Sequence, residues 1–200
     1  MDIIQLAEFY QANEKVDGFG DTFRRRARIL QSMWREERGY PCGTHRGRPL
    51  GSRLPMPWAE DNLANYITPT IRDVVREEVL CDDGSGRLFG RPRIFNDLLS
   101  SQPLCFNLFG ELLRDLHMCS LVLRDLTDGR IERVTALRFE HSPGRGDEAY
   151  TGDGSAFDVY IEYVGPGGTS GFCGIEVKYH EDLRGTAAKH RERYEEIAGE

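Results

Sequence analysis

The 200-residue sequence lacks any hydrophobic run that approaches the ~20 residues needed to cross a bilayer. Its first residues also lack a basic segment followed by an apolar stretch, which a secretory signal would require. We therefore expect a soluble, cytoplasmic protein with no membrane partner. Hydrophobic residues make up 39% of the chain and charged residues 30%, which is typical of a globular domain.

Metal-binding cysteines and nucleotide-binding motifs are lacking as well. The five cysteines are scattered and show neither a C-x-x-C pair nor the cysteine and histidine spacing of a zinc site. We expect the thiols to be reduced and mostly buried. Nothing in the sequence identifies a histidine partner for a cysteine, so a catalytic cysteine is not indicated. The glycine-rich segment 165–171 does not have P-loop spacing and precedes a predicted strand, so it is predicted to be a hairpin turn.

Lysine is nearly absent. Arginine fills 23 of the 26 cationic positions, and only Lys15, Lys178 and Lys189 are lysine. The two side chains are not interchangeable, because the ammonium group of lysine is compact and changes its pKa readily when buried. A lysine at position 178 therefore indicates a site that requires an ammonium group.

The net charge of −7 is unevenly distributed along the chain. Segment 22–53 holds nine arginines and two glutamates and carries +7, which leaves −14 for the remainder. One interpretation is that this segment binds the DNA backbone through Arg24, Arg25 and Arg28, because arginine neutralises phosphates without reading the base sequence. The other is a solvated helix face whose arginines pair with acids elsewhere in the fold, and the sequence leaves both open.

Two acids and a lysine lie on two apolar segments joined by the glycine-rich turn. Asp158 lies in the predicted strand 156–164, and Glu176 and Lys178 lie in the predicted strand 172–179. Alternation along a strand places Glu176 and Lys178 on one face, and antiparallel pairing brings Asp158 beside Glu176. The apolar flanks predict a central strand at 172–179, where charges are costly without a ligand. An ordinary ion pair on a solvated strand is the alternative.

This set of residues suits metal-assisted cleavage of a phosphodiester. Mg²⁺ or Mn²⁺ binds carboxylate oxygens together with waters and substrate phosphate, so Asp158 and Glu176 are the predicted metal ligands. The ion lowers the pKa of a water molecule, and Lys178 is the predicted catalytic cation that orients the water or stabilises the transition state. Glu140 is a predicted further catalytic carboxylate, and Arg145 in the next loop a predicted phosphate contact. For both, an exposed charge without a catalytic role is the alternative.

The motif resembles the signature of the PD-(D/E)XK nuclease superfamily. Asp158 corresponds to its isolated aspartate, Glu176 to its second acid and Lys178 to its lysine, while Phe157 replaces the proline. The wider sequence, including Ser155-Ala-Phe-Asp, is similar to a bacterial group of restriction endonucleases. The resemblance implies a nuclease that acts on DNA, or alternatively on RNA, in defence against foreign DNA. Cutting a duplex would favour a homodimer.

Hydrophobic periodicity predicts several helices and strands. The apolar residues Phe23, Ala27, Leu30 and Trp34 form a stripe that is predicted to face the core of one helix. Residues 39–57 are predicted to be a loop because they are rich in glycine and proline. The predicted helices are 3–14, 22–37, 62–79 with an interruption near Pro69, 107–126 and one from about 182, and the predicted strands are 131–140, 156–164 and 172–179.

The expected fold class is α/β (α+β) with a mixed sheet. A restriction-endonuclease-like core of helix, three strands and helix is expected over 101–200, preceded by a helical, arginine-rich extension over 1–100. The last core strand implied by the resemblance has no residues left after Glu200, which favours a core truncated at its carboxyl end. A catalytically inactive nucleic-acid-binding or assembly protein of the same fold is the competing hypothesis. Asp153, His180, Lys189 and His190 are further candidate site residues.

Overall fold

The computed structural model describes residues 2–13, 22–81, 87, 89–147, 149–150, 152, 154–180 and 196. The chain divides into two compact units, of which the first contains Met1–Asp82, Phe89–Glu111 and Val177–His180. The second contains Asp83–Leu88, Leu112–Glu176 and Glu181–Glu200. The predicted helix from about residue 182 lies outside the described residues. No helix in the described ranges is both long and apolar enough to span a membrane.

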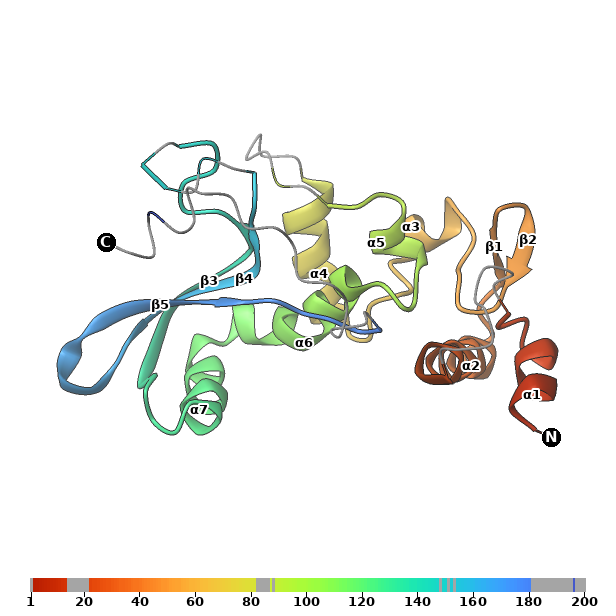
Figure 1. Ribbon diagram of the computed structural model, residues 1–200, viewed down its shortest axis with the longest axis horizontal. Helices are drawn as coiled ribbons and strands as arrows, with labels where there is room; N and C mark the ends of the chain where they lie inside the picture. Colours follow the sequence, from red (N-terminus) through yellow and green to blue (C-terminus); the bar gives the residue numbers. More distant parts are fainter. Residues whose placement is uncertain are drawn as a thin grey trace. The chain divides into compact units, whose positions relative to one another are not determined.

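The first unit begins with two helices that pack against each other, α1 (Ile3–Phe9) and α2 (Thr22–Glu37) (Figure 1). The carboxylate of Asp2 caps α1 by accepting hydrogen bonds from two backbone N–H groups of the first turn. Ala7 and Ile29 are buried where the helices meet. The bounds of α2 confirm the predicted helix 22–37, whereas α1 ends earlier than residue 14.

The buried face of α2 differs from the predicted apolar stripe. Phe23 and Leu30 are 59% and 63% exposed, so their assignment to the core is wrong. Arg28, Ser32 and Arg35 are buried instead, and their spacing places them on one side of the helix. The helix therefore turns a partly polar face toward the interior.

Backbone carbonyls explain how Arg35 is tolerated inside the protein. Its Nε donates a hydrogen bond to the carbonyl oxygen of Gly51 at 2.9 Å, and its Nη1 donates to that of Tyr40 at 2.8 Å. The guanidinium also forms an ion pair with Glu36 at 3.0 Å. Burying a charge is costly unless it is paired and hydrogen-bonded, and these contacts meet that requirement.

Residues 39–57, predicted to be a loop, contain a short hairpin. Strands β1 (Gly43–His45) and β2 (Arg48–Leu50) pair antiparallel. The turn residues Arg46 and Gly47 both have positive φ angles, 52° and 75°, as the common two-residue hairpin turn requires. The prediction missed strands of only three residues inside a segment rich in glycine and proline.

Short helices complete the first unit. The predicted interruption of helix 62–79 near Pro69 is confirmed. Leu63 adopts a left-handed conformation at the end of α3 (Trp58–Asn62), and Thr68 caps a new helix, α4 (Pro69–Val75), through its hydroxyl. Tyr66, Phe95 and Phe106 are buried side chains of this unit. The remaining elements are the π-helical turn η1 (Arg76–Leu80), α5 (Arg93–Asn96) and α6 (Ser101–Arg114), whose residues from Leu112 onward belong to the second unit.

The predicted long helix 107–126 consists of two helices, because α6 ends at Arg114 and α7 covers Leu116–Leu126. Asp115 lies between them, and its carboxylate accepts a hydrogen bond from the backbone N–H of Met118 at 2.9 Å. A helix can begin at this position because an aspartate cap satisfies a free N–H group of the first turn.

The second unit contains a three-stranded antiparallel sheet in the order β3–β4–β5 (Figure 1). Its strands are β3 (Arg133–His141), β4 (Phe157–Val164) and β5 (Ser170–Ile175), with a 3₁₀ turn, η2 (Pro166–Gly168), between the last two. Within the described residues β5 pairs only with β4 and lies at the edge of the sheet, so this part of the chain does not show the predicted central position of strand 172–179. The strand also ends at Ile175 instead of 179.

Helix α7 packs on strand β3 and defines the core side of the sheet. The Ser120 hydroxyl of α7 accepts a hydrogen bond from the backbone N–H of Val134 at 2.8 Å. The paired residues that alternate toward this core are buried: Leu137, Phe139, Val159 and Ile161. The combination of helices with small antiparallel sheets confirms the predicted α/β fold class.

Candidate active site

Asp158 lies on β4, and Glu176 directly follows the end of β5. The pairing of β4 with β5 ends at Val159 and Ile175, and the next residues are Asp158 on one strand and Glu176 on the other. Side chains at opposite positions of an antiparallel pair have Cβ atoms about 4.5–5.5 Å apart. Asp158 is half-buried and Glu176 is exposed. Continuing this register by one position would place the two predicted metal ligands opposite each other, and their role as ligands stays a prediction.

Glu140 lies on the third strand at the same level. Phe139 pairs with Val159 and His141 pairs with Phe157, so Glu140 and Asp158 lie between two consecutive pairs. Glu140 has a positive φ of 48°, which is uncommon for a residue other than glycine and costs about 1 kcal/mol. Such strained residues are found both in turns and at functional sites, so the catalytic role of Glu140 stays a prediction.

The conformation of Glu140 also changes which face His141 occupies. Arg138 and His141 are three residues apart and would point to opposite faces of a regular strand. Both nevertheless contact Tyr160, since the Arg138 guanidinium lies 5.9 Å and the His141 ring 4.6 Å from the tyrosine ring centroid. Burial lowers the pKa of His141, and Arg138 lowers it further, while Glu162 opposes the change. This environment favours a neutral imidazole.

Lys178 belongs to the first unit, where its two neighbours are held in place. Val177 is only 6% exposed, and the hydroxyl of Tyr179 accepts a hydrogen bond from the side-chain amide of Gln31 at 2.6 Å. Glu176, Val177 and Lys178 are exposed, buried and exposed in turn. This matches the alternation predicted from the sequence, although these three residues follow the end of β5.

The predicted phosphate-binding arginines have different environments. Arg28 is buried at 7% exposure, which favours the structural interpretation for this residue. Arg24 and Arg25 are half-buried on α2, and Arg145 is half-buried in the loop after β3. Together with the internally bonded Arg35, Arg28 shows that part of the +7 segment serves to build the first unit.

The described residues contain no group of three or more histidine, cysteine, aspartate or glutamate side chains placed to hold a metal ion. Two neighbouring carboxylates are nevertheless a suitable partial site, because Mg²⁺ usually keeps several waters and binds only one or two carboxylates. Of the further candidates, His180 is half-buried in the first unit, and Asp153, Lys189 and His190 lie outside the described residues.

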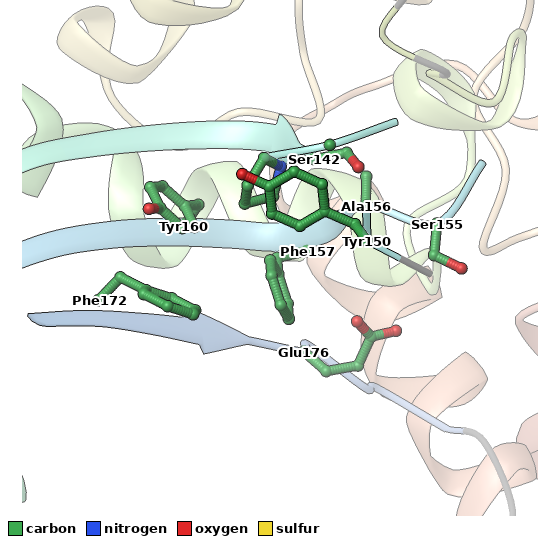
Figure 2. A pocket seen from close by; sticks show the side chains of 10 residues that line it. Ser142, Tyr150, Ser155, Ala156, Phe157, Tyr160, Phe172 and Glu176 are labelled. Atoms are coloured by element: carbon green, nitrogen blue, oxygen red, sulfur yellow. The ribbon is translucent and has the colours of Figure 1, made fainter. Parts of the chain in front are cut away.

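An aromatic pocket of about 620 Å³ lies beside Glu176 in the second unit (Figure 2). Four rings contribute to its lining, those of Tyr150, Phe157, Tyr160 and Phe172. In Figure 2 the carboxylate of Glu176 points from its own chain segment toward the side of Tyr150. Asp158 does not belong to the described lining. Sequence reasoning missed this pocket because its rings come from three separate segments without a common motif.

Comparison with known families identifies one match. Residues 18–200 match the family model of the PD-(D/E)XK nuclease superfamily, and this range includes all three motif residues. No curated protein and no solved structure matches the chain.

Proposed function

We propose that this chain, which belongs to the PD-(D/E)XK nuclease superfamily and has its restriction-endonuclease-like α/β fold, hydrolyses phosphodiester bonds of DNA in a metal-dependent reaction. Most members of the superfamily are nucleases, which supports this activity. DNA as the substrate, Mg²⁺ or Mn²⁺ as the cofactor, the cytoplasm as the location and defence as the role are parts of the proposal. The observation that supports it is that Asp158 and Glu176 each lie one position beyond the last β4–β5 pair, Val159 and Ile175.

Asp158 and Glu176 would hold the divalent ion. Their carboxylates supply the oxygen donors that Mg²⁺ and Mn²⁺ prefer, and two such ligands leave positions for waters and for substrate phosphate. When bound, the ion supplies positive charge that stabilises the reacting phosphate and increases the acidity of water. Glu140, at the same level on β3, provides a further carboxylate for the site.

The cationic residues have separate roles in the proposal. Lys178 follows Glu176 by two positions and stabilises the negative charge that develops on the phosphate oxygens. Arg24, Arg25 and Arg145 contact the backbone phosphates of DNA. Arg28 is left out because it is buried. Residues 101–200 form the nuclease core and residues 1–100 its extension, and a homodimer would place two sites on the two strands of a duplex.

Plasmid cleavage in the presence and absence of Mg²⁺ tests the proposal. We expect Asp158→Asn, Glu176→Gln and Lys178→Met each to reduce the cleavage rate at least about 100-fold, as removal of groups that stabilise a transition state typically does. Asp125→Asn, which changes an exposed acid on α7, is the matched control and is expected to cleave normally.

Cleavage that persists in EDTA, or in the Asp158 and Glu176 variants, would contradict the proposal. DNA binding without any cleavage would instead support a catalytically inactive binding protein. A parallel assay with single-stranded and double-stranded RNA shows whether RNA is the better substrate.

A further inference from the structure

We infer that the aromatic pocket beside Glu176 binds an unstacked nucleobase, so that the substrate is a single-stranded or locally opened nucleic acid. This inference rests on the proposed nuclease function and adds the form of the substrate. All the residues that line the pocket belong to the second unit.

The rings form a nearly parallel series along the sheet. The planes of Tyr160 and Phe172 are inclined by 26° with centroids 5.5 Å apart, and those of Phe157 and Tyr160 by 27° with centroids 6.3 Å apart. Phe172 is 59% exposed and Tyr150 is 49% exposed, so aromatic surface remains open to solvent. Every nucleobase has a flat aromatic face, and proteins bind single strands by stacking bases on such exposed rings.

Two glycines let the rings lie directly against the backbone. A Cβ atom at Gly174 would overlap the ring of Phe157, and one at Gly144 would overlap the ring of Tyr150. Gly174 is paired with Tyr160, which places it on the face of the sheet that carries the pocket. The missing side chains at these two positions therefore create the space in which the aromatic surfaces lie.

The pocket also contains polar groups that suit the edge of a base. The lining includes Ser142, Ser155 and Glu176, whose oxygen atoms can hydrogen-bond to ring nitrogens and exocyclic amines (Figure 2). A mostly apolar pocket with a few polar groups is the usual form of a small-ligand site, and about 620 Å³ lies within the usual range of about 300–1,000 Å³.

A paired base inside a duplex cannot enter such a pocket, because both of its faces are covered by neighbouring bases. Enzymes that enclose a base either act on single strands or rotate the nucleotide out of the helix. Since Glu176 both lines the pocket and is a proposed metal ligand, the bound base belongs to a nucleotide next to the phosphate that is cut.

Oligonucleotide binding in EDTA tests the inference without any hydrolysis. The probes are a single-stranded DNA that contains 2-aminopurine, whose fluorescence falls when the base stacks, and the matching duplex. We expect the wild-type chain to quench the single strand and to bind it more tightly than the duplex. Phe172→Ala should weaken single-strand binding by about tenfold and remove the quenching, whereas Phe172→Trp should retain both. Leu126→Ala, at an exposed apolar residue of α7, is the control and should behave as wild type.

The outcomes separate this inference from the nuclease proposal. Metal-dependent cleavage that requires Asp158, together with single-strand binding that is insensitive to Phe172→Ala, overturns the pocket inference and leaves the nuclease. Phe172-dependent quenching without any cleavage overturns the nuclease and leaves the base pocket. Absence of binding to every probe overturns the pocket inference.

Discussion

The hydroxyl of Tyr179 accepts a hydrogen bond from the side-chain amide of Gln31 at 2.6 Å, although the two residues are 148 positions apart. Gln31 lies on α2, and Tyr179 directly follows the proposed catalytic lysine, Lys178. Val177, which precedes Lys178, is buried, so both sequence neighbours of Lys178 are fixed in position. The bond therefore restricts where the ammonium group can lie.

Tyr179→Phe removes this hydrogen bond and keeps the ring. A typical hydrogen bond contributes about 1 kcal/mol, so we expect kcat of DNA cleavage to fall about fivefold while KM stays the same. Tyr163→Phe on β4 is the control. An unchanged kcat, or a loss of folding stability that accounts for the whole effect, would show that the bond does not position Lys178.

Arg35→Ala tests whether buried arginines of α2 build the fold. It removes two hydrogen bonds to backbone carbonyls and leaves those groups without their donors. We expect the free energy of unfolding in urea to fall by about 3 kcal/mol, whereas Arg26→Ala, at an exposed position of the same helix, should change it by less than about 0.5 kcal/mol. Equal stability of the two variants would contradict this account of the buried arginine.

Glu140→Gly tests whether Glu140 serves the active site at a cost in backbone strain or is a simple surface charge. Glycine adopts a positive φ without steric cost, so the variant should be as stable as wild type or more stable by up to about 1 kcal/mol. If Glu140 serves the active site, cleavage should fall in the same variant. Stability is measured by thermal unfolding, and normal cleavage by a stabilised variant would remove Glu140 from the proposed site.

The buried thiol of Cys119 is predicted to make the free energy of unfolding depend on pH. Burial raises the pKa of its thiol to about 11, above the ordinary value of 9.0. Between these values the unfolded chain loses the proton and the folded chain keeps it, so this contribution to stability is present below pH 9 and is lost as the pH rises toward 11. Cys119→Ala should flatten the fall in unfolding free energy over this range. Alkylation at pH 9 followed by mass spectrometry should modify the exposed Cys81 and spare Cys119.

The helices and strands that agreed with the prediction have clear signals in their local sequence. The bounds of α2 follow from sixteen residues without glycine or proline, and the glycine-rich turn between two apolar segments fixed the β4–β5 hairpin. The register of the same hairpin, continued by one position, would place Asp158 opposite Glu176. The roles of these two acids in the chemistry stay predictions.

The features that escaped prediction depend on contacts that hydrophobic periodicity does not report. The polar interior face of α2 is possible because the carbonyls of Tyr40 and Gly51 meet Arg35, which periodicity cannot reveal. Strand β5 was predicted too long because Val177 continues the apolar alternation, but this residue is buried in the first unit. The aromatic pocket needs the β4–β5 register to bring Tyr160 beside Phe172.

Mn²⁺ binding measured by electron paramagnetic resonance tests the central claim most directly, because it requires neither substrate nor turnover. We predict one Mn²⁺ per chain, with an affinity that falls at least about tenfold in Asp158→Asn and in Glu176→Gln, as loss of a charged ligand should cause. Glu162→Gln, which changes an acid of β4 paired with Arg138, should leave the affinity unchanged. Wild-type affinity in both the Asp158 and Glu176 variants would contradict the account.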